Sequence, residues 1–160
     1  MQTFLPYPDF LTSAKVLDKR RCWKQVVEAK QIIACLENTG CQRWKNHPAV
    51  KMWVGHVDSL QYYYNVFLKH SKEVHGINTK LEYICNYYTG PCVDGSIVFM
   101  SDTYPWWLGN EDFHRAMRAR LIEKYREFYL SKFPNDENYN DSLYWWPDME
   151  TKTFKIIKPK

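Results

Sequence analysis

Four polar side chains lie on one face of a predicted helix near the start of the chain, and one of them is an acid among bases. Arg21, Lys24, Glu28 and Gln31 follow one another at spacings of three or four residues, so they are neighbours on the surface of an α-helix. A carboxylate in such a place can transfer protons, and the cations beside it can hold phosphates. The alternative is an ordinary surface ion pair, which contributes only a few tenths of a kcal/mol.

A helix over residues 19–37 is predicted to position these side chains. Its apolar residues repeat every three or four positions, the pattern of a helix that packs one face on a core. They are Cys22, Val26, Ala29, Ile33 and Leu36. We expect Gly40 to end this helix in a left-handed conformation.

The composition is that of a globular domain with an uneven distribution of charge. The chain has 160 residues, of which 45% are hydrophobic and 25% charged, and its net charge is +4. Residues 133–151 hold five acids and no Lys or Arg, so the rest of the chain carries about +9, which suits a polyanionic partner. No stretch has the apolar length of a membrane span, and the N-terminus lacks the features of a signal peptide. We therefore expect a cytoplasmic protein that is not secreted.

A second long helix is predicted over residues 48–74. Pro48 would be its first residue, with the preceding His47 as the cap. Apolar residues recur along it from Val50 to Phe67 at helical spacing, and they predict a buried seam. Gly55 inside the helix indicates close packing against a neighbouring element.

The third long helix is predicted over residues 110–133, and shorter helices are expected after Asp9 and over residues 78–88. A loop over residues 89–110 with a strand-like run at 96–100, and an irregular tail over 134–160, complete the chain. The pattern predicts an all-α fold, a single compact domain (residues 1–160) of three long helices plus shorter ones. Its expected core contains Val26, Ile33, Trp53, Leu60 and Leu121.

A second cluster of cations lies on the helix predicted over residues 110–133. His114, Arg115, Arg118 and Arg120 have no acid among them, and positive charge in the first turns of a helix opposes its macrodipole. We expect this cluster to have an anionic partner. The alternative is a solvated basic face.

The sequence lacks the common motifs for phosphate binding, for metal binding and for a serine nucleophile. Its five cysteines are an odd number without a CxxC pair, which favours free thiols. The five histidines are spread out and show no spacing typical of a metal site. We therefore expect no metal and no cofactor.

Three segments together resemble the pyrimidine-dimer DNA glycosylase family, whose best-known member is the phage endonuclease V. They are the opening MQTFLPYPDF, the residues Asp18, Arg20 and Arg21 followed by Glu28, and the run WKNHPAVKMWVGHV over residues 44–57. A bacterial branch that shares the opening also carries Phe113-His114, a lysine like Lys124 and a Tyr-x-Trp-Pro run like residues 144–147. Compared with the phage enzyme, one residue is inserted before Glu28, and residues 89–104 have no counterpart.

The resemblance implies an endonuclease V-like helical fold and a DNA repair glycosylase with AP-lyase activity. In this family the N-terminal α-amine attacks C1′ of the damaged nucleotide, expels the base and forms a Schiff base, and a glutamate assists the proton transfer that cleaves the strand. An α-amine, with an ordinary pKa near 8, is about a tenth unprotonated at neutral pH, far more than a lysine. Because Gln2 is large, removal of Met1 is not expected, and the amine would be that of Met1. If Met1 were removed, Gln2 could cyclise and lose its free amine.

The resemblance and the basic faces together give a set of expected site residues. The catalytic ones are Met1, Gln2 and Glu28, and those expected to bind DNA are Arg20, Arg21, Lys24, Gln31, His56, His114, Arg115, Arg118, Arg120 and Lys124. We expect the amine and Glu28 to meet in one cleft, because residues 1–8 show no periodicity that would bury them in the core and Glu28 has polar neighbours. We expect the two basic faces to flank one groove of a monomer that takes double-stranded DNA with damaged or modified bases. The alternatives are a non-catalytic nucleic-acid-binding module on the same fold and a glycosylase for a different modified base.

Overall fold

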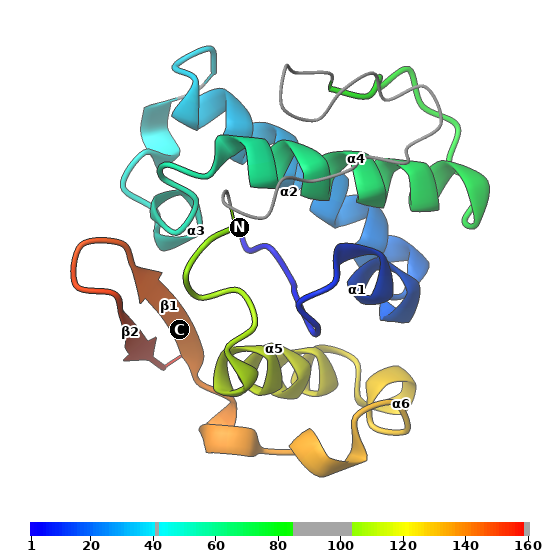
Figure 1. Cartoon of the computed structure of the whole chain (residues 1–160). Coiled ribbons are helices and arrows are strands. Elements are labelled where there is room, and N and C mark those ends of the chain that lie inside the picture. Colours follow the sequence, from blue (N-terminus) through cyan, green and yellow to red (C-terminus); the bar gives the residue numbers. More distant parts are fainter. Residues whose placement is uncertain (41, 85–103, 159–160) are drawn as a thin grey trace.

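Two antiparallel helices form the upper layer of the molecule. The computed structural model describes residues 1–40, 42–84 and 104–158. In Figure 1 helices α2 (Lys19–Leu36) and α4 (Val57–Glu73) cross above the N-terminal segment and the later helix α5 (Glu111–Lys124), with α1 (Phe10–Val16) beside them. Contacts at opposite ends fix their direction, because Cys22 lies against Ser71 and Gln61 donates a hydrogen bond to Glu37. The predicted helices over 19–37 and after Asp9 are therefore present.

Helix α2 begins where the sequence predicted and ends slightly differently. The carboxylate of Asp18 accepts the backbone N–H of Arg21 and caps the first turn. At the other end the left-handed residue is Asn38, with φ 56°, and not Gly40 as expected. Asparagine tolerates this conformation better than most residues with a side chain.

The helix predicted over residues 48–74 is two helices, α3 (Pro48–Lys51) and α4. The cap is the expected one, because Nδ1 of His47 accepts the N–H of Ala49 at 3.1 Å. The break lies at Gly55, whose φ of 78° is a conformation that L side chains rarely adopt. A Cβ at Gly55 would meet nothing within 4 Å, so the glycine serves the turn and not close packing.

The helix predicted over residues 110–133 is also divided, into α5 (Glu111–Lys124) and α6 (Arg126–Tyr129). The backbone of Tyr125 leaves the helical region, and the residue is 43% exposed. A short 3-10 helix, η1 (Gln42–Trp44), precedes α3, and two others, η3 (Pro134–Asp136) and η4 (Tyr139–Ser142), follow α6.

Residues 78–84 of the predicted helix over 78–88 are not helical. Side chains of α4 hold this segment instead. Asn65 both donates to the carbonyl of Ile84 and accepts its N–H, and Tyr64 donates to the carbonyl of Glu82. Some predicted features lie outside the described residues. They are residues 85–88 of the predicted helix, residues 89–103 of the expected loop with its strand-like run at 96–100, and Cys41.

The prediction of an all-α fold is wrong, because the tail contains a two-stranded antiparallel sheet. Strands β1 (Tyr144–Asp148) and β2 (Thr153–Ile157) pair with Trp146 opposite Lys155. The strands are rich in aromatic and β-branched residues, which favour extended structure. Asp148 shapes the connecting turn by accepting the N–H groups of Glu150 and Thr151.

Buried residues of α2, α4, α5 and the N-terminal segment form one hydrophobic core. The expected core residues Val26, Ile33, Trp53, Leu60 and Leu121 are all buried. Among the described residues, no helix is both long enough and apolar enough to cross a membrane.

Candidate functional site

The first residues form an extended segment that runs through the interior of the molecule. It passes between the α2/α4 pair and α5 (Figure 1), and Thr3 and Leu5 are fully buried. The lack of periodicity in residues 1–8 was therefore misleading about their burial. An extended single segment forms no hydrogen bonds with itself, so its buried backbone groups need partners from other elements.

Side chains from both upper helices bind the backbone of Phe4. Its N–H donates to Oε1 of Gln25 at 2.8 Å, and its carbonyl accepts the hydroxyl of Tyr63 at 3.0 Å. The same hydroxyl lies 2.9 Å from Oε1 of Gln25, and both side chains are fully buried. The sequence analysis missed them, although Gln25 is a polar residue within the apolar stripe of α2 and could have been noticed for that reason.

Helix α5 holds the next two carbonyls through residues that were expected to bind DNA. The N–H of Gly109 donates to Nε2 of His114 at 3.0 Å, so the proton is on Nδ1, which donates to the carbonyl of Leu5 at 2.7 Å. Burial lowers the pKa of His114 and outweighs the opposing effect of the Leu5 carbonyl, which favours this neutral form. Arg118 donates to the carbonyl of Pro6 at 2.7 Å.

This anchoring places the start of the chain against Glu28. The N-terminal nitrogen of Met1 lies 3.8 Å from Oε1 of Glu28, and the backbone N–H of Gln2 donates to Oε2 at 3.2 Å. Lys24 contacts the carboxylate from one helical turn away, with its Nζ 3.6 Å from Oε1. One carboxylate oxygen is thus fixed by the backbone, while the other faces two amines.

The amine and the carboxylate open into a cavity of about 270 Å³, which we call the amine pocket. It is lined by Met1, Gln2, Phe4, Arg20, Arg21, Lys24, Gln25, Glu28, Lys124 and Tyr144. Four of these side chains are cations and Glu28 is the only acid. The pocket therefore combines an α-amine, a carboxylate and an excess of positive charge.

Arg21 is held in place by the cap of its own helix. It donates to Asp18 at 2.9 Å and to the carbonyl of Lys124 at 3.0 Å. Burial acts to raise the pKa of Asp18, but hydrogen bonds from Tyr129 and Arg21 outweigh it and hold the pKa below its ordinary value. The hydrogen bond from Arg21 to Lys124 joins the start of α2 to the end of α5 and fixes this wall of the pocket.

His47 lies close enough to the pocket for the N-terminal charge to affect its pKa. Burial and, to a lesser degree, the positive amine lower its pKa. Its ring stands edge-on to Trp146, with the centroids 6.0 Å apart. The sequence indicates only a capping role for His47, because it does not show that the folded chain brings the N-terminal charge near this ring.

The arginine cluster of α5, which is Arg115, Arg118 and Arg120, does not line the amine pocket, and the anionic partners expected for it are found within the chain. Arg115 and Arg118 both bind Asp136, at 2.7 and 2.6 Å. Arg118 also binds Glu111 at 2.5 Å, and Arg120 pairs with Glu123. Their anionic partners are acids of this chain.

Two other expected residues lie elsewhere. Gln31 lines a separate cavity between α2 and η1, together with Lys30 and Trp44. His56 is the first residue before α4. The structure therefore brings Met1, Gln2, Glu28, Arg20, Arg21, Lys24 and Lys124 together and leaves the other predicted residues outside the pocket.

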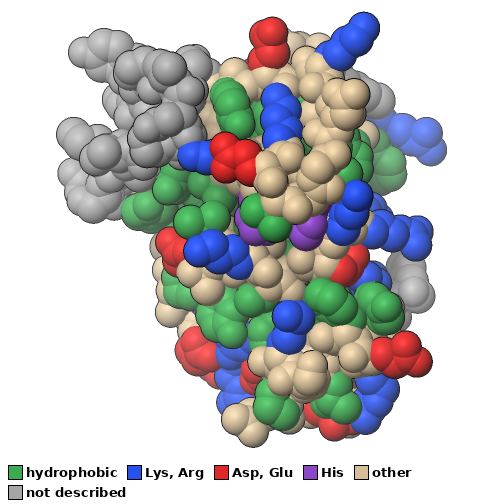
Figure 2. All heavy atoms as spheres, turned by 90° about the vertical axis from the view of Figure 1, so that its right-hand side faces the viewer, with side chains coloured by type: hydrophobic (Ala, Val, Ile, Leu, Met, Phe, Trp, Pro, Cys, Tyr) green, Lys and Arg blue, Asp and Glu red, His purple; other side chains and the backbone are tan. Residues whose placement is uncertain are grey.

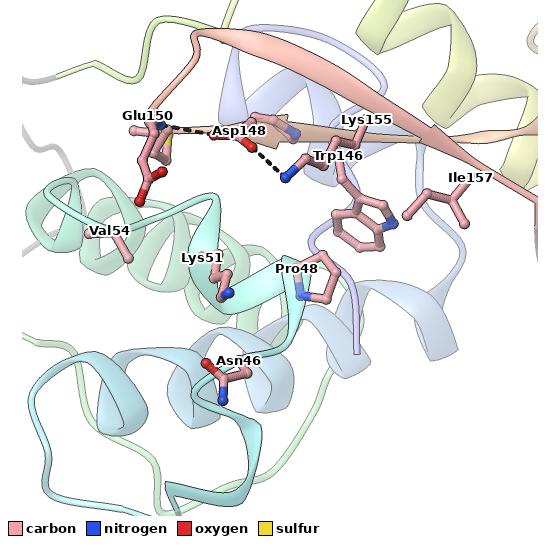
Figure 3. A pocket seen from close by; sticks show the side chains of 11 residues that line it. Asn46, Pro48, Lys51, Val54, Trp146, Asp148, Glu150, Lys155 and Ile157 are labelled. Carbon is pink, nitrogen blue, oxygen red and sulfur yellow. Dashed lines mark hydrogen bonds and ion pairs between the residues drawn. The ribbon is translucent and has the colours of Figure 1, made fainter.

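Size does not single out the amine pocket. A cavity of about 430 Å³ lies between α3 and the hairpin, and Figure 3 shows Pro48 and Trp146 on its wall. Its carboxylate Asp148 is paired with Lys155 at 2.5 Å, as the dashed line marks. The amine pocket is the better candidate because, of these two cavities, it is the one that holds the α-amine of Met1 beside the buried carboxylate of Glu28.

The family model described as pyrimidine dimer DNA glycosylase matches residues 1–84. The match covers more than half of the chain and includes the N-terminus, α2 and Glu28. Searches of curated proteins and of solved structures found no match.

Proposed function

The chain belongs to the pyrimidine dimer DNA glycosylase family, and we propose that it removes a damaged base through its N-terminal amine and then cleaves the strand as an AP lyase. Membership of the family indicates a DNA repair glycosylase whose substrate is damaged DNA. The proposal adds the identity of the nucleophile, the role of Glu28 and the second reaction.

One observation carries this proposal, namely the 3.8 Å between the Met1 nitrogen and Oε1 of Glu28 in a pocket lined by cations. The amine is the first group of a buried segment whose backbone is hydrogen-bonded to other elements at Phe4, Leu5 and Pro6. Its position is therefore fixed by the fold, and a positioned nucleophile reacts faster than a free one.

In the proposed reaction the unprotonated amine of Met1 attacks C1′, and the bond from C1′ to the base breaks with its electron pair leaving on the base. Loss of the amine proton and opening of the sugar ring give a Schiff base between Met1 and C1′. The carboxylate of Glu28 accepts the amine proton and passes it to O4′ as the ring opens. It is then free to accept the C2′ proton, after which the 3′ phosphate leaves.

The cations of the pocket are proposed to bind the DNA backbone. Arg20 is exposed and the side chain of Lys24 is 65% exposed, so DNA phosphates can reach both. The acid that a phosphate would compete with at Lys24 is Glu28. Such contacts release counterions and make binding depend on salt. Because the amine lies in a pocket, the target nucleotide would have to leave the duplex to react, and a damaged base is the least costly to unstack.

Trapping with borohydride tests the proposal. Reduction of a Schiff base leaves the protein covalently attached to the DNA, which a denaturing gel detects. We expect trapping and strand cleavage with the intact chain on a duplex that contains a pyrimidine dimer or an abasic site, and neither on undamaged duplex. A panel of other modified bases would show whether the pocket takes a different lesion.

A matched pair of variants makes the test specific to the N-terminus. One extra residue ahead of Met1 would move the amine away from Glu28 and should abolish trapping, whereas the same residue added at the C-terminus should have no effect. DNA binding without any trapping or cleavage by the intact chain would refute the proposed chemistry and favour a binding module.

A further inference from the structure

A thiol and two imidazoles meet at the end of the α2/α4 pair. Cys22 is in the first turn of α2, His70 is in the last turn of α4, and His75 follows that helix. Each contributes one potential ligand atom, and these atoms all lie within 4.8 Å of one another. Figure 2 looks onto the side of the molecule where α4 ends, and histidine side chains are visible near its centre.

The chain reversal after α4 brings the two histidines together. Gly76 adopts a φ of 63°, and the N–H of Ile77 donates back to the carbonyl of Ser71 at 3.0 Å. A left-handed residue suits such a reversal, and glycine takes this conformation at little cost. The rings of His70 and His75 consequently lie edge to face, with centroids 5.1 Å apart.

The polar atoms of this cluster are poorly satisfied in the described structure. Nε2 of His75 is buried and has no hydrogen-bond partner among the described residues. Cys22 is fully buried, and its sulfur lies 3.4 Å from the hydroxyl of Ser71. Buried polar atoms in native proteins are normally paired, so an unpaired imidazole nitrogen beside a thiol and a second imidazole needs an explanation.

We propose that Cys22, His70 and His75 bind one zinc ion. Sulfur and imidazole nitrogen are the donors that Zn²⁺ takes in proteins, whereas Mg²⁺ and Ca²⁺ prefer oxygen. Around a tetrahedral ion with bonds of about 2.0–2.3 Å, ligand atoms are roughly 3.4–3.6 Å apart. The three atoms would move closer by about an ångström, the thiol would release its proton to solvent, and a water molecule would complete the coordination.

This site revises the sequence-based expectation of no metal. The ligands come from three elements, and the spacing between Cys22 and the histidines carries no motif, so only the fold reveals them. The ion would join the first turn of α2 to the last turn of α4. Because Cys22 and Glu28 lie on the same helix, α2, zinc bound to Cys22 would also stiffen the helix that carries Glu28.

Cobalt and zinc titrations test the proposal without reference to DNA. The full chain would be reduced, stripped of metal with a chelator and titrated with Co²⁺. We expect one equivalent to produce a sulfur-to-cobalt charge-transfer band, and one equivalent of Zn²⁺ to remove it and to raise the melting temperature. Absence of the band and of any thermal shift at stoichiometric metal would overturn the proposal.

Variants assign the ligands. Cys22→Ala and His75→Ala should each lower the zinc affinity by at least about 100-fold, since even the loss of an outer hydrogen-bond partner costs 10–100-fold. Cys35→Ala is the matched control, because Cys35 is another buried cysteine of the same helix. His75→Ala, at a half-buried position, also guards against a failure of Cys22→Ala to fold. A charge-transfer band that persists in Cys22→Ala would show that other thiols hold the metal and would contradict the site.

Discussion

Two groups of cations in this molecule resemble each other in sequence and differ in the structure. Arg20 and Lys24 of α2 line the amine pocket, and Lys24 pairs with Glu28. Arg118 and Arg120 of α5 are almost fully buried and paired with acids. The first group is available to a ligand, whereas the second holds the protein together.

The difference arises from what each helix packs against. Helix α5 is covered by the tail, which supplies Asp136 to Arg115 and Arg118, and its inner face supplies bonds to the N-terminal segment through His114 and Arg118. The polar face of α2 is left to the pocket. A cluster of positive charge therefore indicates a nucleic-acid site only where the fold leaves the charges unpaired.

The largest expected effect separates the pocket from the rest of the surface. Glu28→Gln is nearly isosteric but cannot accept a proton, so we expect strand cleavage to fall by about 10²–10⁴-fold while binding to lesion-bearing duplex is retained. Glu37→Gln is the matched control, since Glu37 lies at the far end of the same helix and accepts a hydrogen bond from Gln61. Normal cleavage by Glu28→Gln in single-turnover assays would remove Glu28 from the reaction.

Arg118 is predicted to matter for stability. Arg118→Met would leave Glu111 without its partner and the buried Asp136 with Arg115 alone, and it would free the carbonyl of Pro6. Breaking a buried pair costs about 3–5 kcal/mol, and the remaining contact with Arg115 places the expected loss at the lower end. Denaturant unfolding measures it. A stable variant with weakened DNA binding would return Arg118 to the DNA interface.

His114 should make stability depend on pH. Burial holds its pKa below the ordinary 6.5, so the unfolded state takes up a proton first as the pH falls. The stability that the neutral ring contributes is therefore full above pH 6.5 and decreases as the pH falls below it. Between about pH 7.5 and 5, the free energy of unfolding should depend less steeply on pH in His114→Gln than in the parent. His47 and His70 titrate in both proteins, so they do not account for the difference. Curves of equal slope would contradict the assignment.

The smallest effect is expected at Arg20. Because its side chain is exposed, Arg20→Ala should change the free energy of unfolding by no more than about 0.5 kcal/mol. If Arg20 neutralises one phosphate, the slope of log affinity against log salt should fall by about 0.9. An unchanged slope would place the phosphates elsewhere, and it would remove the contrast with Arg118.

The periodicity of α2 made that helix predictable, and the spacing of Arg21, Lys24 and Glu28 identified one wall of the pocket. The breaks at Gly55 and Tyr125 were not predicted, because an apolar repeat continues across a turn when both flanking helices face the same core. The hairpin was missed because its ten strand residues were read as part of an irregular tail.

The buried N-terminal segment was the main feature that the sequence did not reveal. A single extended chain inside a core has neither the period of a helix nor a neighbouring strand, and its partners Gln25, Tyr63, His114 and Arg118 come from three helices. The pairing of Arg118 with Asp136 was hidden for the same reason, because 18 residues separate them in the chain.

Mapping the covalent adduct tests the central claim most directly. The amine pocket contains three primary amines in the described structure, those of Met1, Lys24 and Lys124, and each could form a Schiff base. After borohydride trapping on abasic-site DNA, nuclease and protease digestion followed by mass spectrometry would identify the modified peptide. The account predicts the nucleotide remnant on the α-nitrogen of Met1. A remnant on Lys24 or Lys124, with Met1 unmodified, would contradict it.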